Sequence, residues 1–503
     1  MGLVQKIGRG MFWNFVGKAT IAVVGLLTSV LIVRLLGPDQ YGLWIIILTV
    51  SSLSLAFSSF GLESGINKFV PEFRAEKEDK KAHKTINMAL LTRSLILLFI
   101  SITLCLSARL ISNYLLRRPQ TLFYIRIVPL LMIPLGLSGI LTSFLNALYE
   151  QKFLNLLRMF TSSVNFIGIL ILYLMKVGIL AILCLTVLVN IITLIFLFMK
   201  ARKEISFGNF KEDISRVVKY CRTMWLAGLG DSLLGKRQDL FLLGVFGALR
   251  DAGGYDIAFT LPYTMRVLLI NSVFEGVGLA SLSELVGKKD YFNFKKGVEL
   301  LRKYIYLIIF PLAIGGCLLG NSIVRVIYGA EYLYMVLPLQ MFFLVPIAAT
   351  LFGPTSLTLA SLGEEKYILR SKMIGIVNLG LNLLLIPKHG MIGALIGTSV
   401  SWFFMGAYEY YVITKVVQIP LSFPIKFIFK ILLAAIIMGT SIYSFRAQES
   451  LVGILYVSCF GVIIYTFGLR LFKIFDMEDI ETLRRTRIPL SRYFIRALGY
   501  AYK

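Results

Sequence analysis

The sequence predicts an all-α integral membrane protein with about fourteen transmembrane helices. Three observations indicate this fold class. Hydrophobic residues make up 57% of the 503-residue chain and charged residues only 16%, and the mean hydropathy is +0.80. Apolar stretches of roughly 20 residues, long enough to cross a bilayer, recur along the whole chain. Basic residues gather in the short segments between these stretches, which is typical of a polytopic membrane protein and not of a soluble one.

The candidate membrane spans follow one another with short connections. They lie near residues 12–36, 41–62, 88–112, 122–146, 156–175, 178–199, 223–246, 256–284, 304–327, 336–361, 368–386, 391–414, 427–446 and 451–472. Pro129 and Pro134 interrupt the fourth span, and Arg266 and Glu275 lie within the eighth. The first span is too long for a cleaved signal peptide, so we interpret it as a retained helix.

The distribution of lysine and arginine predicts the orientation of the chain. If the N-terminus is cytoplasmic, the inner loops and the basic tail 473–503 hold about four basic residues for each one in the outer loops, as the positive-inside rule requires. An even number of helices returns the C-terminus to the same side. We therefore expect a multi-pass protein of the cell (cytoplasmic) membrane with both termini in the cytoplasm.

Composition also argues against several classes of function. The net charge is +25, from 52 Lys and Arg against 27 Asp and Glu, but the basic residues do not form the single patch or arm expected of a nucleic-acid binder. The five cysteines lack a CxxC pair, and the two histidines lie in different loops. We therefore expect no nucleic-acid partner, no disulfide framework, no metal site and no cofactor.

The seventh span carries an unusual group of charges. Asp231, Lys236, Arg237 and Asp239 lie within an otherwise apolar stretch, and each charge at membrane depth costs on the order of 2.5–3.5 kcal/mol on insertion scales. Lys236 and Asp239 are three positions apart and could pair on one helix face, but Arg237 points elsewhere. Two interpretations remain: the helix lines a hydrated cavity that receives an anionic ligand, or the charges form structural pairs between helices.

Four further charges extend this set. Lys18, in the first span, fits either a cavity residue or an interfacial anchor that snorkels to the inner surface. Arg266 lies about 15 Å from the outer end of the eighth span, at 1.5 Å per residue, which is too deep for easy snorkelling. Glu275 could serve ion coupling or a salt bridge, and we expect Glu63 to be an ordinary charge at a membrane boundary.

An internal repeat predicts the domain organisation. Trp13 and Trp225 each open a span, and each span is followed by a turn that ends in a tyrosine, Tyr41 or Tyr255. Six helices followed by six more in parallel orientation imply two lobes related by an axis along the membrane normal. The sequence is thus predicted to consist of the following parts: a six-helix lobe (1–200), an amphipathic cytoplasmic linker (201–222), a second six-helix lobe (223–416), two extra helices (427–472) and a basic cytoplasmic tail (473–503).

The stretch RLLGPDQYG at residues 34–42 and the run DLFLLG at 239–244, within this fourteen-helix pattern, resemble Wzx-type oligosaccharide flippases. These form the polysaccharide-transporter branch of the multidrug/oligosaccharidyl-lipid/polysaccharide exporter superfamily. The resemblance covers the whole chain and implies a MATE-like fold that works by alternating access. It also implies transport of polyprenyl-linked sugars from the cytoplasmic to the outer leaflet.

The resemblance further implies a cationic central cavity that takes the phosphate and sugar headgroup. By position, Lys18, Lys236, Arg237 and Arg266 would contact that headgroup. Asp231, Asp239 and Glu275 would be the acidic groups for ion coupling or for the cavity. The expected partners are a lipid-linked oligosaccharide, membrane lipid and a coupling ion, Na⁺ or H⁺, and we expect a monomer.

Two alternatives belong to other functional classes. A multidrug or cation exporter of the same superfamily would favour an acidic cavity, whereas the deep charges here are slightly more basic than acidic. A membrane-embedded oligosaccharide polymerase or glycosyltransferase would need a sizeable outer loop with acidic groups or histidines for acid–base chemistry. No outer loop is long enough, so we expect a transporter rather than an enzyme.

Overall fold

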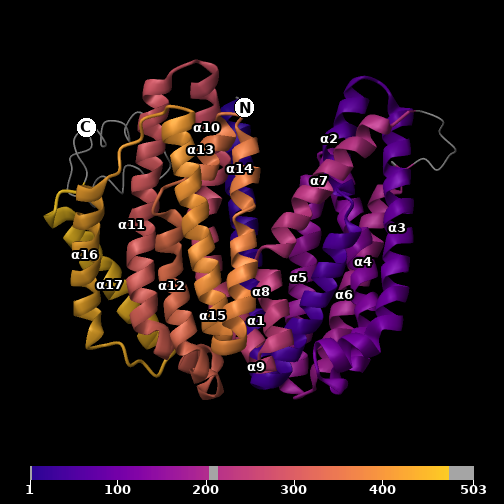
Figure 1. Cartoon of the computed structure of the whole chain (residues 1–503), viewed down its shortest axis with the longest axis horizontal. Helices are drawn as coiled ribbons and strands as arrows, with labels where there is room; N and C mark the ends of the chain where they lie inside the picture. Colours follow the sequence, from indigo (N-terminus) through magenta and orange to yellow (C-terminus); the bar gives the residue numbers. More distant parts are fainter. Residues whose placement is uncertain (1–2, 203–204, 206–212, 475–503) are drawn as a thin grey trace. The chain divides into compact units, whose positions relative to one another are not determined.

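The computed structural model describes residues 3–202, 205 and 213–474, with side-chain surroundings for these except 3–20, 227, 231–233, 271–277 and 280. Throughout this described part, every regular element is a helix (Figure 1). Ten stretches of it are long and apolar enough to cross a membrane. The predicted all-α membrane fold is confirmed.

The chain divides into two compact units: unit 1 is Met1–Gly253 with Asn382–Met391, and unit 2 is Gly254–Leu381 with Ile392–Lys503. The helices up to the end of the seventh predicted span are α1 (Leu3–Ser58), α2 (Leu62–Ala75), α3 (Asp79–Leu110), α4 (Leu122–Ala147), α5 (Gln151–Leu174), α6 (Ile179–Ala201), α7 (Ser215–Leu233) and α8 (Lys236–Phe246). The remaining helices are α9 (Leu249–Arg266), α10 (Ser272–Gly287), α11 (Tyr291–Ile323), α12 (Val336–Thr350), α13 (Thr355–Ser361), α14 (Glu365–Lys372), α15 (Gly375–Tyr411), α16 (Ile425–Tyr443) and α17 (Leu451–Leu471).

Ten apolar stretches account for twelve of the predicted spans, because two stretches contain two spans each. The stretch Ile21–Ser58 is broken at Gly37, and Glu365–Val416 is broken at Gly390. Both glycines have a positive φ, 68° and 53°, a conformation that glycine adopts without steric penalty. No stretch of the described residues matches the seventh and eighth predicted spans, parts of which (227, 231–233, 271–277 and 280) lie outside the residues whose side chains are described.

The prediction of one continuous helix over residues 223–246 is wrong. The helix α7 ends at Leu233 and α8 begins at Lys236, and Gly235 between them is extended, with φ −127° and ψ −163°. Glycine in a helix interior costs about 1 kcal/mol relative to alanine, and this span contains Gly228, Gly230 and Gly235. The glycines of this span therefore weaken its helix, and the helix is interrupted at Gly235.

The predicted linker continues directly into α7, and its apolar residues pack inside unit 1. Ile214, Val217 and Cys221 are buried in the same hydrophobic cluster as residues of α2. A Cβ atom at Gly61 would overlap the carbonyl oxygen of Cys221, and one at Gly65 would overlap its sulfur. Glycines on α2 thus allow the two helices to approach closely, and the apolar face of this segment is covered by protein.

The two turns that follow the repeated spans meet within unit 1. A Cβ atom at Gly42 would overlap the carbonyl oxygen of Leu249, and one at Gly253 would lie 2.9 Å from the ring of Tyr41. The nearest atoms around Gly42 are all main-chain atoms of Leu249 and Arg250. This contact between backbones fixes α1, just after its break at Gly37, against the start of α9.

Within unit 2, α11 packs against both α12 and α16. The helices α16 and α17 pair along their lengths and correspond to the two predicted extra helices. Their buried residues form one hydrophobic cluster with α11. Asp290 caps the start of α11 by accepting hydrogen bonds from the Asn293 amide groups, and these bonds hold the pKa of the Asp290 carboxyl below its ordinary value.

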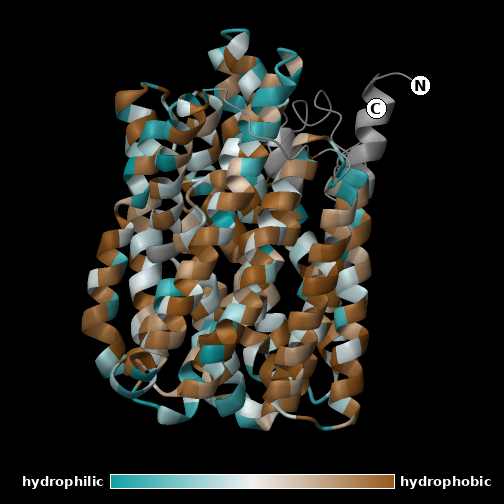
Figure 2. Cartoon of the chain, turned by 90° about the vertical axis from the view of Figure 1, so that its right-hand side faces the viewer, coloured by the Kyte–Doolittle hydropathy of each residue, from teal (hydrophilic) through white to brown (hydrophobic). Residues whose placement is uncertain are grey.

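Large apolar side chains remain exposed along the membrane-length helices. On α3 the exposed residues Leu91, Leu95, Leu98, Ile102 and Leu106 recur every three or four positions and form one face. In Figure 2 hydrophobic colour dominates the helix surfaces, and hydrophilic colour gathers near helix ends. Contiguous apolar surface of this extent is rare on soluble monomers and suits contact with lipid tails.

A buried carboxylate joins three helices of unit 2. Glu409 of α15 is 4% exposed. One of its oxygens accepts hydrogen bonds from the hydroxyls of Thr355 and Ser356 on α13, and the other accepts from the Ser371 hydroxyl on α14, each at 2.7 Å. These bonds meet the requirement that a buried polar group finds partners.

Replacing Glu409 with alanine is expected to lower the melting temperature of the purified protein by several degrees. Three hydroxyls, two of them buried, would lose their acceptor, and each such bond contributes about 1 kcal/mol. The matched control is Glu449→Ala, which removes an exposed glutamate. Thermal unfolding in detergent measures both variants, and equal melting temperatures would contradict a bracing role for Glu409.

Candidate functional site

The first turn of α8 holds three of the predicted site residues. Lys236 is half-buried, Arg237 is exposed and Asp239 is fully buried. A helix N-terminus carries a partial positive charge, so Asp239 is favourable there, whereas Lys236 and Arg237 are not. The two cations therefore do not stabilise the helix that they begin, and their position calls for another explanation.

Asp239 has a buried partner from a distant part of the chain. The Asn382 side-chain amide donates a hydrogen bond to Asp239 Oδ1 at 2.6 Å, and both residues are 0% exposed. Asn382 lies in the segment of α15 that belongs to unit 1. Sequence reasoning missed this residue, although Asn378 and Asn382, one helical turn apart in an apolar run, were a usable signal.

Two buried side-chain amides at this position retain unused hydrogen-bonding capacity: that of Asn382 and that of Gln238, the neighbour of Asp239 in the sequence. Within the described residues, Asn382 Oδ1 and both amide atoms of Gln238 have no hydrogen-bond partner. Carboxylate and amide oxygens are the hard ligands that cations such as Na⁺ or Mg²⁺ prefer. The Asp239 carboxylate and the Asn382 amide oxygen are thus both of the ligand types that such cations use.

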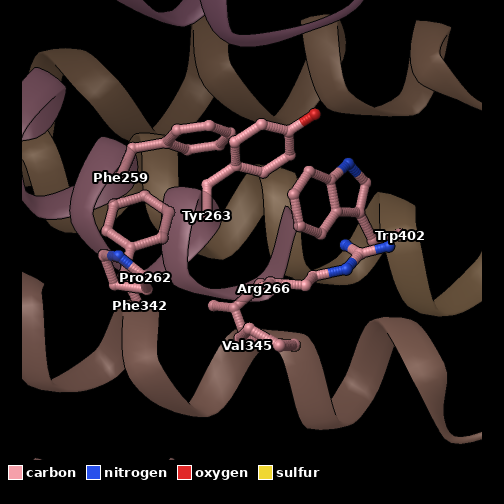
Figure 3. Close-up of a pocket in the computed structure, with 8 residues that line it drawn as sticks. Phe259, Pro262, Tyr263, Arg266, Phe342, Val345 and Trp402 are labelled. Carbon is pink, nitrogen blue, oxygen red and sulfur yellow. The ribbon is translucent and has the colours of Figure 1, made fainter. Parts of the chain in front are cut away.

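Arg266 lies in a small aromatic pocket of unit 2 (Figure 3). Its guanidinium carbon is 6.0 Å from the centroid of the Trp402 ring, within the range of a cation–π interaction. The other lining residues come from α9 and α12: Phe259, Pro262, Tyr263, Phe342, Val345 and Pro346. A volume of about 10 Å³ accommodates roughly one water molecule and no larger ligand.

Glu63, predicted to be an ordinary charge at a membrane boundary, takes part in an ion pair in unit 1. It forms a salt bridge with Arg93 of α3, with 3.5 Å between Glu63 Oε1 and Arg93 Nη2. The Arg93 side chain is only 4% exposed and that of Glu63 28%. A Cβ atom at Gly136 would lie 3.2 Å from Arg93 Nε, and one at Gly139 would lie 3.3 Å from Glu63 Oε1. Glycines on α4 thus leave room for the pair.

The remaining predicted site residues are distributed unevenly. Lys236, Arg237 and Asp239 are brought together in α8, whereas Arg266 belongs to unit 2. The side chains of Lys18, Asp231 and Glu275 lie outside the described residues. Among the side chains that are described, no group of three or more His, Cys, Asp and Glu could hold a metal ion. A shared cavity for the predicted cations stays a prediction.

A family model described as "Polysaccharide biosynthesis protein" matches residues 31–337 of the chain. This match covers more than half of the sequence. The chain belongs to the polysaccharide biosynthesis protein family. The chain is similar to the uncharacterized membrane protein MJ1068 of Methanocaldococcus jannaschii. The two are 22% identical over 514 residues, which cover 95% of this chain and 99% of the relative.

Solved structures show the fold of this polysaccharide biosynthesis protein. It is similar to the lipid II flippase MurJ in an inward closed conformation, with a TM-score of 0.74 at 18% identity, covering 91% of this chain and 98% of MurJ. It is also similar to an inward-facing multidrug resistance MATE transporter, with a TM-score of 0.65 at 13% identity, covering 79% and 95%.

A third similar structure is a MOP superfamily transporter from Pyrococcus furiosus, described as having a binding pocket of reverse polarity that suggests a different function. Its TM-score is 0.53 at 15% identity, covering 80% of this chain and 94% of that one. The predicted Wzx-type resemblance and MATE-like fold are confirmed. The chain shares its fold with these membrane flippases and transporters.

The Arg93–Glu63 pair predicts a non-additive effect on stability. Glu63→Ala leaves the Arg93 guanidinium buried without a counter-charge, and losing one partner of a fully buried pair costs about 3–5 kcal/mol, less for a partly exposed one. The double variant Glu63→Ala/Arg93→Met removes both charges and should recover most of the lost melting temperature. Thermal unfolding of the single and double variants tests this, and additive losses would contradict it.

Proposed function

We propose that the protein flips a polyprenyl-phosphate-linked oligosaccharide from the cytoplasmic to the outer leaflet, for the synthesis of surface polysaccharide or glycoprotein. The observation that carries this proposal is the placement of cations. Lys236 and Arg237 lie in the first turn of α8, directly after the extended Gly235, and Arg266 lines the aromatic pocket at the end of α9. Membership of the polysaccharide biosynthesis family and similarity to the fold of a lipid II flippase support the same substrate class.

The chemistry of the headgroup explains why such cations would be needed. A phosphate and several sugar hydroxyls lose their hydration when they enter hydrocarbon, which is strongly unfavourable. Lysine and arginine replace that water with charge-assisted hydrogen bonds to the phosphate oxygens. The polyprenyl chain can remain in lipid while the headgroup crosses.

The mechanism that we infer is alternating access between two lobes around a cationic central cavity, with Lys18, Lys236, Arg237 and Arg266 contacting the headgroup. In this proposal the two predicted lobes rock against each other, and the break at Gly235 allows α7 and α8 to bend relative to one another. The protein would act as a monomer in the cell membrane, with both termini in the cytoplasm. It would move its substrate without changing it chemically.

Reconstitution into liposomes tests the proposal. Vesicles contain the protein and a short-chain polyprenyl-diphospho-disaccharide, and an added glycosidase that cannot cross the bilayer reports how much of the lipid reaches the outer leaflet. Wild-type protein should make nearly all of the lipid accessible, whereas protein-free vesicles protect the inner-leaflet fraction.

Arg237→Ala and Arg266→Ala should each slow this transfer by about tenfold or more, because a hydrogen bond to a charged group contributes roughly 1.5–3 kcal/mol. The matched control is Lys388→Ala, which removes an exposed cation outside the proposed cavity. Wild-type rates in both arginine variants would overturn the cationic-cavity mechanism. Transport of cationic dyes without lipid transfer would instead indicate an exporter, and a chemically altered sugar lipid would indicate an enzyme.

We also propose Asp239 as the group that couples transport to Na⁺ or H⁺. The carboxylate is fully buried and accepts a hydrogen bond from the Asn382 amide, whose oxygen has no hydrogen-bond partner among the described residues. Binding of a cation or a proton would change the charge at this carboxylate and with it the balance of forces that holds α8 against α15.

Asp239→Asn should make lipid transfer insensitive to an imposed Na⁺ or H⁺ gradient, because the substituted side chain neither binds a proton nor attracts a cation. Initial rates with and without each gradient, in the same liposomes, measure the effect. Asp290→Asn serves as the control, since Asp290 caps α11 at an exposed position. Unchanged gradient dependence in Asp239→Asn would exclude this residue as the coupling group.

A further inference from the structure

The aromatic residues around Arg266 form a continuous row with one open end. Tyr255 and Phe259 of α9 are buried and contact the ring of Phe342 edge to face, at 5.1 and 5.5 Å between centroids. Tyr263 extends the row by one helical turn, stacked on Phe259 at 5.4 Å with 28° between the ring planes. Unlike the other members, Tyr263 is 43% exposed.

Trp402 of α15 completes this open end. Its ring lies 6.0 Å from that of Phe259, edge to face, and is partly exposed. Figure 3 shows the rings of Phe259, Tyr263 and Trp402 side by side, with the Arg266 guanidinium beside the indole. The row therefore ends in two accessible aromatic residues, each with a polar group, next to a cation.

We propose that Tyr263 and Trp402 form a sugar-binding shelf, which holds the sugar directly attached to the phosphate that Arg266 binds. This inference rests on the proposed function, and it assigns the part of the substrate recognised at this position. The pocket beneath the shelf has room for about one water molecule, so the sugar lies on the shelf at its mouth and not inside it.

The chemistry of a pyranose ring fits these side chains. One face of the ring presents C–H groups with a small positive charge, and the faces of phenol and indole rings carry a negative partial charge, so the two attract. The rim of the sugar carries hydroxyls, which the Tyr263 hydroxyl and the Trp402 N–H can meet as hydrogen-bond partners. A sugar without charge is thus recognised by aromatic side chains, while the phosphate requires the arginine.

The separation of the groups fits a glycosyl phosphate. The guanidinium carbon of Arg266 is 6.0 Å from the Trp402 ring centroid, and Tyr263 and Arg266 are three positions apart on α9, on the same helix face. In a glycosyl phosphate a single bridging oxygen joins the sugar to phosphorus. A phosphate held by Arg266 therefore places the attached sugar within reach of both rings.

Two probes that differ only in the sugar test the shelf. Purified protein in lipid nanodiscs is titrated with a polyprenyl diphosphate and with the same lipid carrying one N-acetylglucosamine. Wild-type protein should bind the sugar-bearing probe about tenfold more tightly, as expected for contacts with two aromatic rings. Tyr263→Ala and Trp402→Ala should reduce this ratio to near one, whereas Arg266→Ala should weaken the binding of both probes.

Matched variants separate the shelf from general loss of packing. Phe404→Ala removes a large exposed aromatic residue from the same helix as Trp402, outside the pocket, and should keep the wild-type ratio. Tyr263→Phe should keep most of the wild-type affinity ratio between the two probes, because the aromatic ring remains. Where an alanine variant does not fold, Tyr263→Leu and Trp402→Leu preserve apolar volume. These variants should still reduce the affinity ratio between the two probes to near one.

The possible failures point to different conclusions. If the wild-type protein binds both probes equally, or if the ratio survives in the Tyr263 and Trp402 variants, the shelf is overturned while the proposed function stands. If the wild-type protein binds neither probe, the proposed function fails, and the shelf with it.

Discussion

The constraint on which the structure depends is that a buried charge inside a membrane-length helix needs a partner from another helix. Arg93 of α3 pairs with Glu63 of α2, Asp239 of α8 with Asn382 of α15, and Glu409 of α15 with hydroxyls on α13 and α14. Helices in lipid associate through close packing and through interhelical polar contacts. These polar contacts therefore add specificity to the apolar packing that joins the helices within each unit.

The two cations Lys236 and Arg237 of the seventh predicted span differ from these pairs in where they lie on their helix. Lys236 and Arg237 begin a helix at the end where positive charge is unfavourable, directly after the extended Gly235. Irregular backbone at membrane depth is tolerated where it is buried in protein or lines a water-filled space. The break in the helix and the two cations are thus parts of one feature, and both are expected where a polar substrate crosses.

Sequence reasoning predicted the fold class and most of the spans, because hydropathy over a window of membrane length depends only on local composition. It did not predict the break at Gly235, where three glycines and a run of charges compete with the apolar residues around them. It also missed Asn382 as the partner of Asp239 and Arg93 as the partner of Glu63. Those contacts join residues that are far apart in the chain, and their identification requires knowing which helices are adjacent. The aromatic row beside Arg266 was missed for the same reason, since its rings come from three helices.

The contact between Gly42 and Leu249 has a consequence for how this family can diversify. Because the nearest atoms around Gly42 belong to the main chain, a side chain at this position would meet backbone that cannot rotate away. A Cβ atom at Gly253 would meet the ring of Tyr41, which is itself buried. Homologues can therefore carry a larger residue at either position only where these two segments of the chain move apart.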